Sequence, residues 1–322
     1  MFRLSQPQFI NLHRVTLKIT LPVLILLVLA LAMPTATQDT PPSTEDRLSD
    51  VQVQRQPLQA LYQIEVRANI SGWTDSLHWQ AGLAHATLGD LHAAAAHWQQ
   101  ANLQSTERLR RLGQVHIDLN QWGPAVDTLE HLLTLDPAND WAHFQLGVLL
   151  AASDPSRAMQ HLVAVPFGSR YEVVVGRAAT AIVTDDVVLN AMRIGLLLLS
   201  EDVPYAAELA FQYAAVLAHP YPEALAYVGL AREQQGKDGS QAMESAVRLD
   251  PDAAPVQYLY GLYLRARDEL EASRNALLIA ATIEAANPAY YAELGEAHRL
   301  LAEYQAAEIA LIRAADLSDQ DE

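Results

Sequence analysis

Residues 287–317, NPAYYAELGEAHRLLAEYQAAEIALIRAADL, contain the residue spacing that decides the fold. Gly295 and Ala307 have almost no side chain, so two antiparallel helices can bring their backbones close together where these residues lie. Leu294 and Leu311 are large enough to fill the seam on either side. The stretch therefore predicts one tightly packed pair of helices.

The glycine of this stretch recurs along the chain with a regular spacing. It appears as Gly82, Gly113, Gly147, Gly195, Gly229, Gly261 and Gly295. The steps between these positions are 31, 34, 48, 34, 32 and 34 residues. We call these seven residues the ladder glycines, and their spacing indicates repeated helix pairs.

The last repeat resembles the tetratricopeptide repeat (TPR), a helix–turn–helix unit with a period of about 34 residues. The residues that carry the resemblance are Tyr291, Leu294, Gly295, His298, Ala307, Leu311 and Ala314. The resemblance extends from about Ser71 to the C-terminus. It implies an all-α fold with negligible strand, in which about seven TPR-like helix pairs form a right-handed α-solenoid.

The N-terminus has the form of an export signal. Residues 1–18 are a basic segment with Arg3, Arg14 and Lys18, and residues 19–38 carry no formal charge and begin with an uninterrupted apolar run. A basic flank keeps the N-terminus in the cytoplasm, so the repeats are expected on the extracytoplasmic side.

Two fates of residues 19–38 stay open. The run is about long enough to span a bilayer, which needs roughly 20 residues, and this favours a retained membrane anchor. Ala30-Leu31-Ala32 has the small-x-small form of a cleavage site, and cleavage would give a secreted protein.

Three further segments complete the predicted organisation. Residues 39–52 read as a disordered linker, residues 53–318 as the TPR superhelix and residues 319–322 as an acidic tail. Within the superhelix, Pro57–Arg67 is predicted to be a capping helix.

An irregular insertion is expected at about residues 167–187. The step from Gly147 to Gly195 is 48 residues, which is 14 more than one period of 34. Residues 171–183, YEVVVGRAATAIV, contain the β-branched run Val173-Val174-Val175, which is compatible with a strand. In an all-helical array one additional helix is favoured.

Composition excludes several functional classes. The chain has no cysteine, so disulfides and thiolate chemistry are excluded. Beyond residue 38 it carries 18 basic and 38 acidic residues, and a net charge of −20 makes nucleic acid an unfavourable partner. His78 and His85 lie seven residues apart without a His-Glu-x-x-His motif, so they could ligate a metal only with help from elsewhere. The TPR resemblance places His85, His116 and His298 where the family has Tyr, which implies that they are packing residues. We expect no metal, no cofactor and no enzyme activity.

The TPR resemblance implies that the first helix of each repeat lines a concave groove. Counting each ladder glycine as place eight, the groove residues fall at places two, five, nine, twelve and thirteen. The predicted set is Trp79, Leu83, Arg110, Trp141, Phe144, Val148, Met192, Leu196, Leu199, Tyr258, Leu262, Arg265 and Arg299.

The chemistry of this set favours an apolar ligand. It lacks the clustered Lys, Arg and Asn with which some family members grip a C-terminal carboxylate. An aromatic and aliphatic groove suits the apolar stripe of an amphipathic helix, or an extended apolar peptide. The alternative is that some of these side chains close a tight superhelix on themselves, or cover the segment near Tyr171.

Two functions are compatible with this organisation. The first is a membrane-tethered, non-enzymatic scaffold that binds a peptide or an amphipathic helix of a partner protein. The second is a stoichiometric structural subunit, or an assembly factor, of a membrane-associated complex. In both, the partner is a protein whose identity the sequence does not name, and the N-terminal segment provides the membrane contact.

Overall fold

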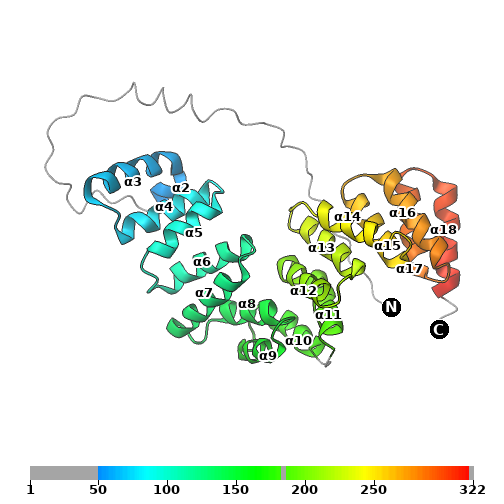
Figure 1. The fold of residues 1–322 in the computed structure, drawn as a ribbon, viewed down its shortest axis with the longest axis horizontal. Coiled ribbons are helices and arrows are strands. Elements are labelled where there is room, and N and C mark those ends of the chain that lie inside the picture. The colour runs from blue at the N-terminus through cyan, green and yellow to red at the C-terminus, as the bar shows by residue number, and fades with distance from the viewer. Residues whose placement is uncertain (1–49, 183–185, 319–322) are drawn as a thin grey trace, which may run out of the picture. The chain divides into compact units, whose positions relative to one another are not determined.

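The computed structural model describes residues 50–182 and 186–318 of the 322-residue chain. Every regular element in these two ranges is an α-helix, and there are seventeen of them (Figure 1). The prediction of an all-α fold with negligible strand is therefore confirmed for the described residues.

The predicted membrane segment is not among these residues. The basic segment 1–18, the signal or anchor segment 19–38, linker residues 39–49 and the tail 319–322 all lie outside the described ranges. No helix within the described ranges is both long and apolar enough to cross a membrane.

Fourteen helices form seven consecutive pairs, and we call the first helix of each pair the A helix and the second the B helix. The A helices are α4 (Asp75–Thr87), α6 (Thr106–Asp118), α8 (Asp140–Leu150), α11 (Val187–Ser200), α13 (Pro222–Gln234), α15 (Ala254–Ala266) and α17 (Pro288–Leu300). The B helices are α5 (Leu91–Gln100), α7 (Trp122–Leu135), α9 (Pro155–Ala164), α12 (Pro204–Leu217), α14 (Ser240–Leu249), α16 (Leu270–Ile283) and α18 (Tyr304–Ser318). Each A helix packs against the B helix that follows it, so the seven predicted pairs are present.

Five of the seven ladder glycines make room for a large side chain of the partner helix: Gly82, Gly147, Gly195, Gly261 and Gly295. A Cβ atom built on Gly195 would lie 2.5 Å from Cε1 of Phe211, and one built on Gly295 would lie 2.7 Å from Cγ of Leu311. Gly82 meets Trp98 in the same way. Because these partners lie sixteen residues after their glycines, a local sequence spacing produces the close helix pair.

Between the A and B helices the chain reverses direction at one residue whose backbone has the left-handed conformation. In six of the seven pairs it lies seven positions after the ladder glycine. These residues are Gly89, Asn120, Asp202, Gly236, Asp268 and Ala302, with φ between 57° and 82°. Glycine adopts this conformation freely, and Asn and Asp tolerate it better than other residues do.

Two helices precede the first pair. α3 (Pro57–Ser71) contains the predicted capping helix and buries Ala60, Ile64 and Ala68 on its α4 side. α2 (Asp50–Arg55) begins in the last residues of the predicted linker and packs on α3 and α4 with Val53 buried.

The predicted insertion contains one extra helix. α10 (Glu172–Ala181) lies between the third and fourth pairs and packs against α9 and α11. The expectation of a helix rather than a strand in this segment is therefore confirmed up to Ala181, and residues 183–185 lie outside the described ranges.

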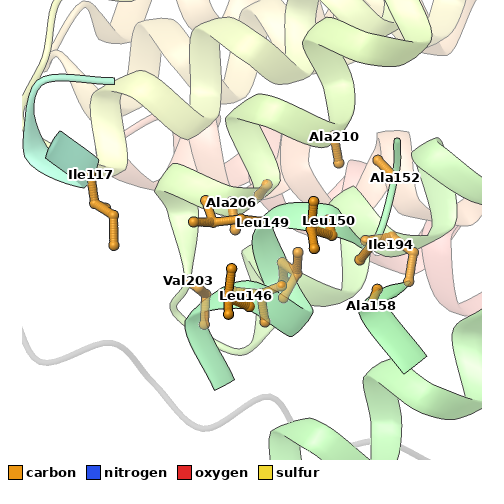
Figure 2. Close-up of a cluster of buried hydrophobic side chains, with 14 of the residues drawn as sticks. Ile117, Leu146, Leu149, Leu150, Ala152, Ala158, Ile194, Val203, Ala206 and Ala210 are labelled. Atoms are coloured by element: carbon orange, nitrogen blue, oxygen red, sulfur yellow. The ribbon is translucent and has the colours of Figure 1, made fainter. Parts of the chain in front are cut away.

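The largest buried cluster joins helices of different pairs. Figure 2 shows Ile117 of α6, Leu146 of α8, Ile194 of α11 and Val203, which precedes α12, among its side chains. These residues come from repeats two, three and four, so the core here is built between repeats as well as within them.

Candidate functional site

The structure divides the predicted groove residues into a buried group and an accessible group. The buried side chains are Trp79, Leu83, Trp141, Phe144, Val148 and Met192. The accessible side chains are Arg110, Leu196, Leu199, Tyr258, Leu262, Arg265 and Arg299. Except for Arg110, the accessible group comes from the fourth to seventh repeats.

Trp79 is covered by the N-terminal helices and by the second repeat. Its indole Nε1 donates a 3.4 Å hydrogen bond to Oδ2 of Asp50 in α2. Its ring stacks on Trp98 with a centroid distance of 5.3 Å, and the guanidinium of Arg108 lies 4.9 Å from the ring centroid. The first repeat therefore offers no open aromatic surface at Trp79.

Phe144 is covered by the inserted segment. Its ring lies parallel to that of Tyr171, with centroids 4.3 Å apart and planes 10° apart. Nearby, Trp141 lies beneath the guanidinium of Arg110, which is 5.2 Å from its ring centroid. The contact of Phe144 with Tyr171 corresponds to the alternative in which groove side chains cover the segment near Tyr171. Trp141 and Phe144 are both buried, at 6% and 5% exposure.

A hydrogen bond between repeats closes the same region further. Tyr205 of α12 donates to Oε1 of Gln145 in α8 over 2.6 Å. Burial raises the pKa of the Tyr205 hydroxyl above its usual value, so it stays a proton donor. Met192 of α11 is buried in the largest hydrophobic cluster, and Tyr205 packs against that cluster.

The accessible apolar residues of the predicted set lie on the A helices α11 and α15. Leu196 is 41% exposed, and Leu199, Tyr258 and Leu262 are half-buried. The Tyr258 ring packs against that of Tyr290, with centroids 4.9 Å apart.

Two further leucines extend this surface, and the sequence analysis missed both. Leu189 of α11 is exposed and Leu230 of α13 is half-buried. They occupy places two and nine of their repeats, so the same count from the ladder glycine identifies them. We call the six residues Leu189, Leu196, Leu199, Leu230, Tyr258 and Leu262 the C-terminal A-helix face.

Two of the arginines beside this face are paired. Arg265 forms an ion pair with Glu293, and Arg299 lies 2.6 Å from Glu296 within α17. Glu223 is half-buried. Its burial, and to a smaller extent the nearby carboxylate of Glu284, raise the pKa of the Glu223 carboxyl. The face therefore presents apolar side chains next to compensated arginines, which does not favour binding of an isolated carboxylate.

The histidines form packing contacts between helices. Nδ1 of His78 lies 3.2 Å from Nδ1 of His97, and Trp73 packs against both rings with centroid distances of 4.8 Å. Within residues 50–182 and 186–318, no group of three or more His, Asp or Glu side chains is arranged to hold a metal ion.

No protein family model matches the sequence, and no curated protein matches it. Among solved structures, the chain is similar to a MamA protein with 15% identity over 67% of this chain and 92% of that chain, at a TM-score of 0.34. It is also similar to a tetratricopeptide repeat protein from Parabacteroides merdae ATCC 43184, with 14% identity over 77% of this chain and 95% of that chain, at a TM-score of 0.37. The repeat assignment itself rests on the helix pairing and the glycine contacts.

Proposed function

We propose that the chain is a non-enzymatic protein-interaction scaffold, and that its C-terminal A-helix face binds an amphipathic helix or an extended apolar peptide of a partner protein. The observation that carries the proposal is the accessible leucine and tyrosine surface on α11, α13 and α15. Grouped apolar side chains in contact with water are typical of interaction sites. A helix or strand that covers them gains the free energy of burying their surface.

Paired charges support the choice of an apolar ligand. Arg265 and Arg299 already interact with glutamates, so a ligand carboxylate would have to displace Glu293 or Glu296. An apolar ligand needs no such exchange. Binding should therefore depend only weakly on salt, because few unpaired charges take part.

The proposal includes export and membrane tethering. The basic segment 1–18, followed by the uncharged segment 19–38, supports export with the repeats on the extracytoplasmic side. In this proposal the repeats form a right-handed superhelix. Protease added to spheroplasts or protoplasts should degrade the repeats, and full protection would refute export. Mass spectrometry of the native N-terminus should find an intact anchor, and a new N-terminus after Ala32 would show a cleaved signal.

Substitutions on the face test the binding site directly. Leu196→Lys and Leu262→Lys each place a charge on the face, so both should remove a partner that co-purifies with the wild-type chain from solubilised membranes. Val216→Lys is the matched control, because Val216 of α12 is 76% exposed on a B helix. A partner retained by both face variants would exclude this surface.

A stoichiometric structural subunit is the second candidate function. It is favoured by the outer side of α18, where Tyr304, Ile309 and Ile312 are exposed. A subunit would co-purify at a fixed ratio that face variants leave unchanged. A scaffold would give a sub-stoichiometric partner that an apolar peptide can compete away.

A further inference from the structure

Two pairs of histidines join the A and B helices of the first and third repeats. Nδ1 of His78 in α4 lies 3.2 Å from Nδ1 of His97 in α5. Nδ1 of His143 in α8 lies 3.1 Å from Nδ1 of His161 in α9. In each pair, therefore, the same nitrogen atom of both rings faces the partner ring.

The two pairs occupy equivalent positions in their repeats. His78 and His143 each lie four residues before their ladder glycine. His97 and His161 each lie seven residues after the aspartate that caps the N-terminus of their B helix. The geometry of one helix pair thus places two imidazole nitrogens together twice in the chain.

The spacing of the nitrogens matches that of two ligands on one transition-metal ion. A Zn–N bond to histidine is about 2.0–2.1 Å long, and two such bonds at a tetrahedral angle place their nitrogens roughly 3.1–3.4 Å apart. The observed distances of 3.2 and 3.1 Å agree with this value. No ring has to move far for both Nδ1 atoms of a pair to bind the same ion.

A backbone contact prepares His143 to be a ligand. Its Nε2 donates a 3.0 Å hydrogen bond to the carbonyl oxygen of Pro137. A neutral imidazole carries one proton, so the lone pair of His143 lies on Nδ1, the atom that faces His161. Histidines that bind metals commonly donate their other N–H to a backbone carbonyl in this way.

The B-helix histidines are neutral at pH 7, as metal binding requires. Burial first, and then the neighbouring histidines, lower the pKa of both His97 and His161. All four rings are half-buried, so an ion can reach them from solvent. The acidic chain, with a net charge of −17, also attracts cations.

We propose that each histidine pair binds one divalent transition-metal ion through its two Nδ1 atoms, with water in the remaining positions. The nearby carboxylates of Asp75 and Glu130 already form ion pairs with arginines. Imidazole suits Zn²⁺, Ni²⁺ and Cu²⁺, of which Cu²⁺ should bind most tightly, whereas Mg²⁺ and Ca²⁺ prefer oxygen ligands.

The ion would join the A helix to the B helix of its repeat. Without an ion, the same spacing accommodates an N–H···N hydrogen bond, so metal binding moves the proton of His161 from Nδ1 to Nε2. The expectation of no metal rested on the spacing of histidines along one helix, whereas each pair comes from two helices. The inference is independent of the proposed function of the C-terminal A-helix face.

Isothermal titration of the full chain with Zn²⁺ tests the proposal. The chain is kept in detergent at pH 7.5 and carries no polyhistidine tag. We expect two ions per chain, one ion for His97→Gln or His161→Gln, and none for the double variant. His92→Gln is the matched control, because His92 is exposed on α5 and belongs to neither pair, and it should still bind two ions.

Fewer than two ions in the wild-type chain would overturn the proposal, and so would a double variant that still binds Zn²⁺. A second measurement identifies the ligands. Cu²⁺ bound to the His97→Gln chain, which retains only the pair of His143 and His161, should show electron paramagnetic resonance splitting from two nitrogens. Splitting from fewer nitrogens would exclude this pair as the site.

A third measurement needs no variant, so it does not depend on how well the variants fold. An ion that binds only the folded chain raises the melting temperature. Zn²⁺ should therefore raise the melting temperature of the wild-type chain, and EDTA should reverse the shift. An unchanged melting temperature at saturating Zn²⁺ would contradict the joining of the two helices.

Discussion

Lys237 donates a 2.8 Å hydrogen bond from Nζ to Oδ1 of Asn120, although the two residues are 117 positions apart. The contact joins the turn of the second repeat to the turn of the fifth. Burial lowers the pKa of Lys237, and the buried carboxylate of Glu208 opposes this shift. Repeats two and five therefore meet through their turns.

A double-mutant cycle should detect this contact as a coupling between two distant turns. Lys237→Met removes the donor, and Asn120→Gly removes the acceptor while it keeps the left-handed turn that Asn120 forms. The two changes together should destabilise less than their sum, with a coupling of about 1 kcal/mol for a partly exposed hydrogen bond. Additive losses in denaturant unfolding would show that the contact contributes nothing to stability.

Gly195→Ala should destabilise the fold by about 1–3 kcal/mol, as overpacking of a core does. The added Cβ would lie 2.5 Å from the ring of Phe211, which is fully buried. Gly176→Ala in α10 is the control, since nothing lies within 4 Å of its added Cβ. We expect the control to raise stability by roughly 0.5–1 kcal/mol through its helix propensity.

Ala302→Gly should stabilise the chain. Ala302 has a φ of 59°, and a non-glycine residue in the left-handed region is strained by roughly 1–2 kcal/mol. Glycine removes this strain, and the greater freedom of the unfolded chain offsets part of the gain. Ala96→Gly in the middle of α5 should do the opposite and destabilise by about 0.5–1 kcal/mol. A lower melting temperature for Ala302→Gly would contradict the left-handed turn.

Phe144→Ala should reduce stability by about 3–5 kcal/mol, because it removes a buried ring stacked on Tyr171. Leu196→Ala, on the accessible face, should change stability by less than about 0.5 kcal/mol. If thermal unfolding showed similar small effects for both variants, the burial of Phe144 by the inserted segment would be wrong.

The chain should lose stability as the pH falls from 7 towards 5. His97 and His161 each face a second histidine across their helix pair, with Nδ1–Nδ1 distances of 3.2 Å to His78 and 3.1 Å to His143. Burial first, and then the neighbouring histidine charges, lower the pKa of both His97 and His161 below 6.5.

The sign follows from the proton uptake of the two states. Between the lowered pKa of the folded chain and 6.5, the unfolded chain binds more protons, so stability decreases as the pH falls through this window. Well above 6.5 both states are neutral and the contribution is constant. His97→Gln and His161→Gln should flatten the pH dependence of unfolding between pH 7 and 5, and an unchanged slope would exclude these two residues as its origin.

The sequence by itself determined the helix pairs, because their contacts are local. A ladder glycine and its large partner are separated only by the end of the A helix, the turn and the start of the B helix. The sixteen-residue spacing of Gly295 and Leu311 therefore predicts their contact without knowledge of other repeats. The same count places Leu196 and Leu262 at groove positions of their A helices. It would also have identified Leu189 and Leu230.

Only the tertiary structure decided which groove residues are open. Phe144 is covered by Tyr171, which belongs to a segment outside the repeat pattern, and Trp79 is covered by α2, which precedes it. Lys237 and Asn120 meet although repeats three and four lie between theirs in the sequence. Such contacts depend on how successive helix pairs are rotated against one another. The spacing of the repeats in the sequence does not determine that rotation. The apolar side chains at equivalent places of the repeats look alike in sequence, and packing between repeats buries some of them and leaves others in water.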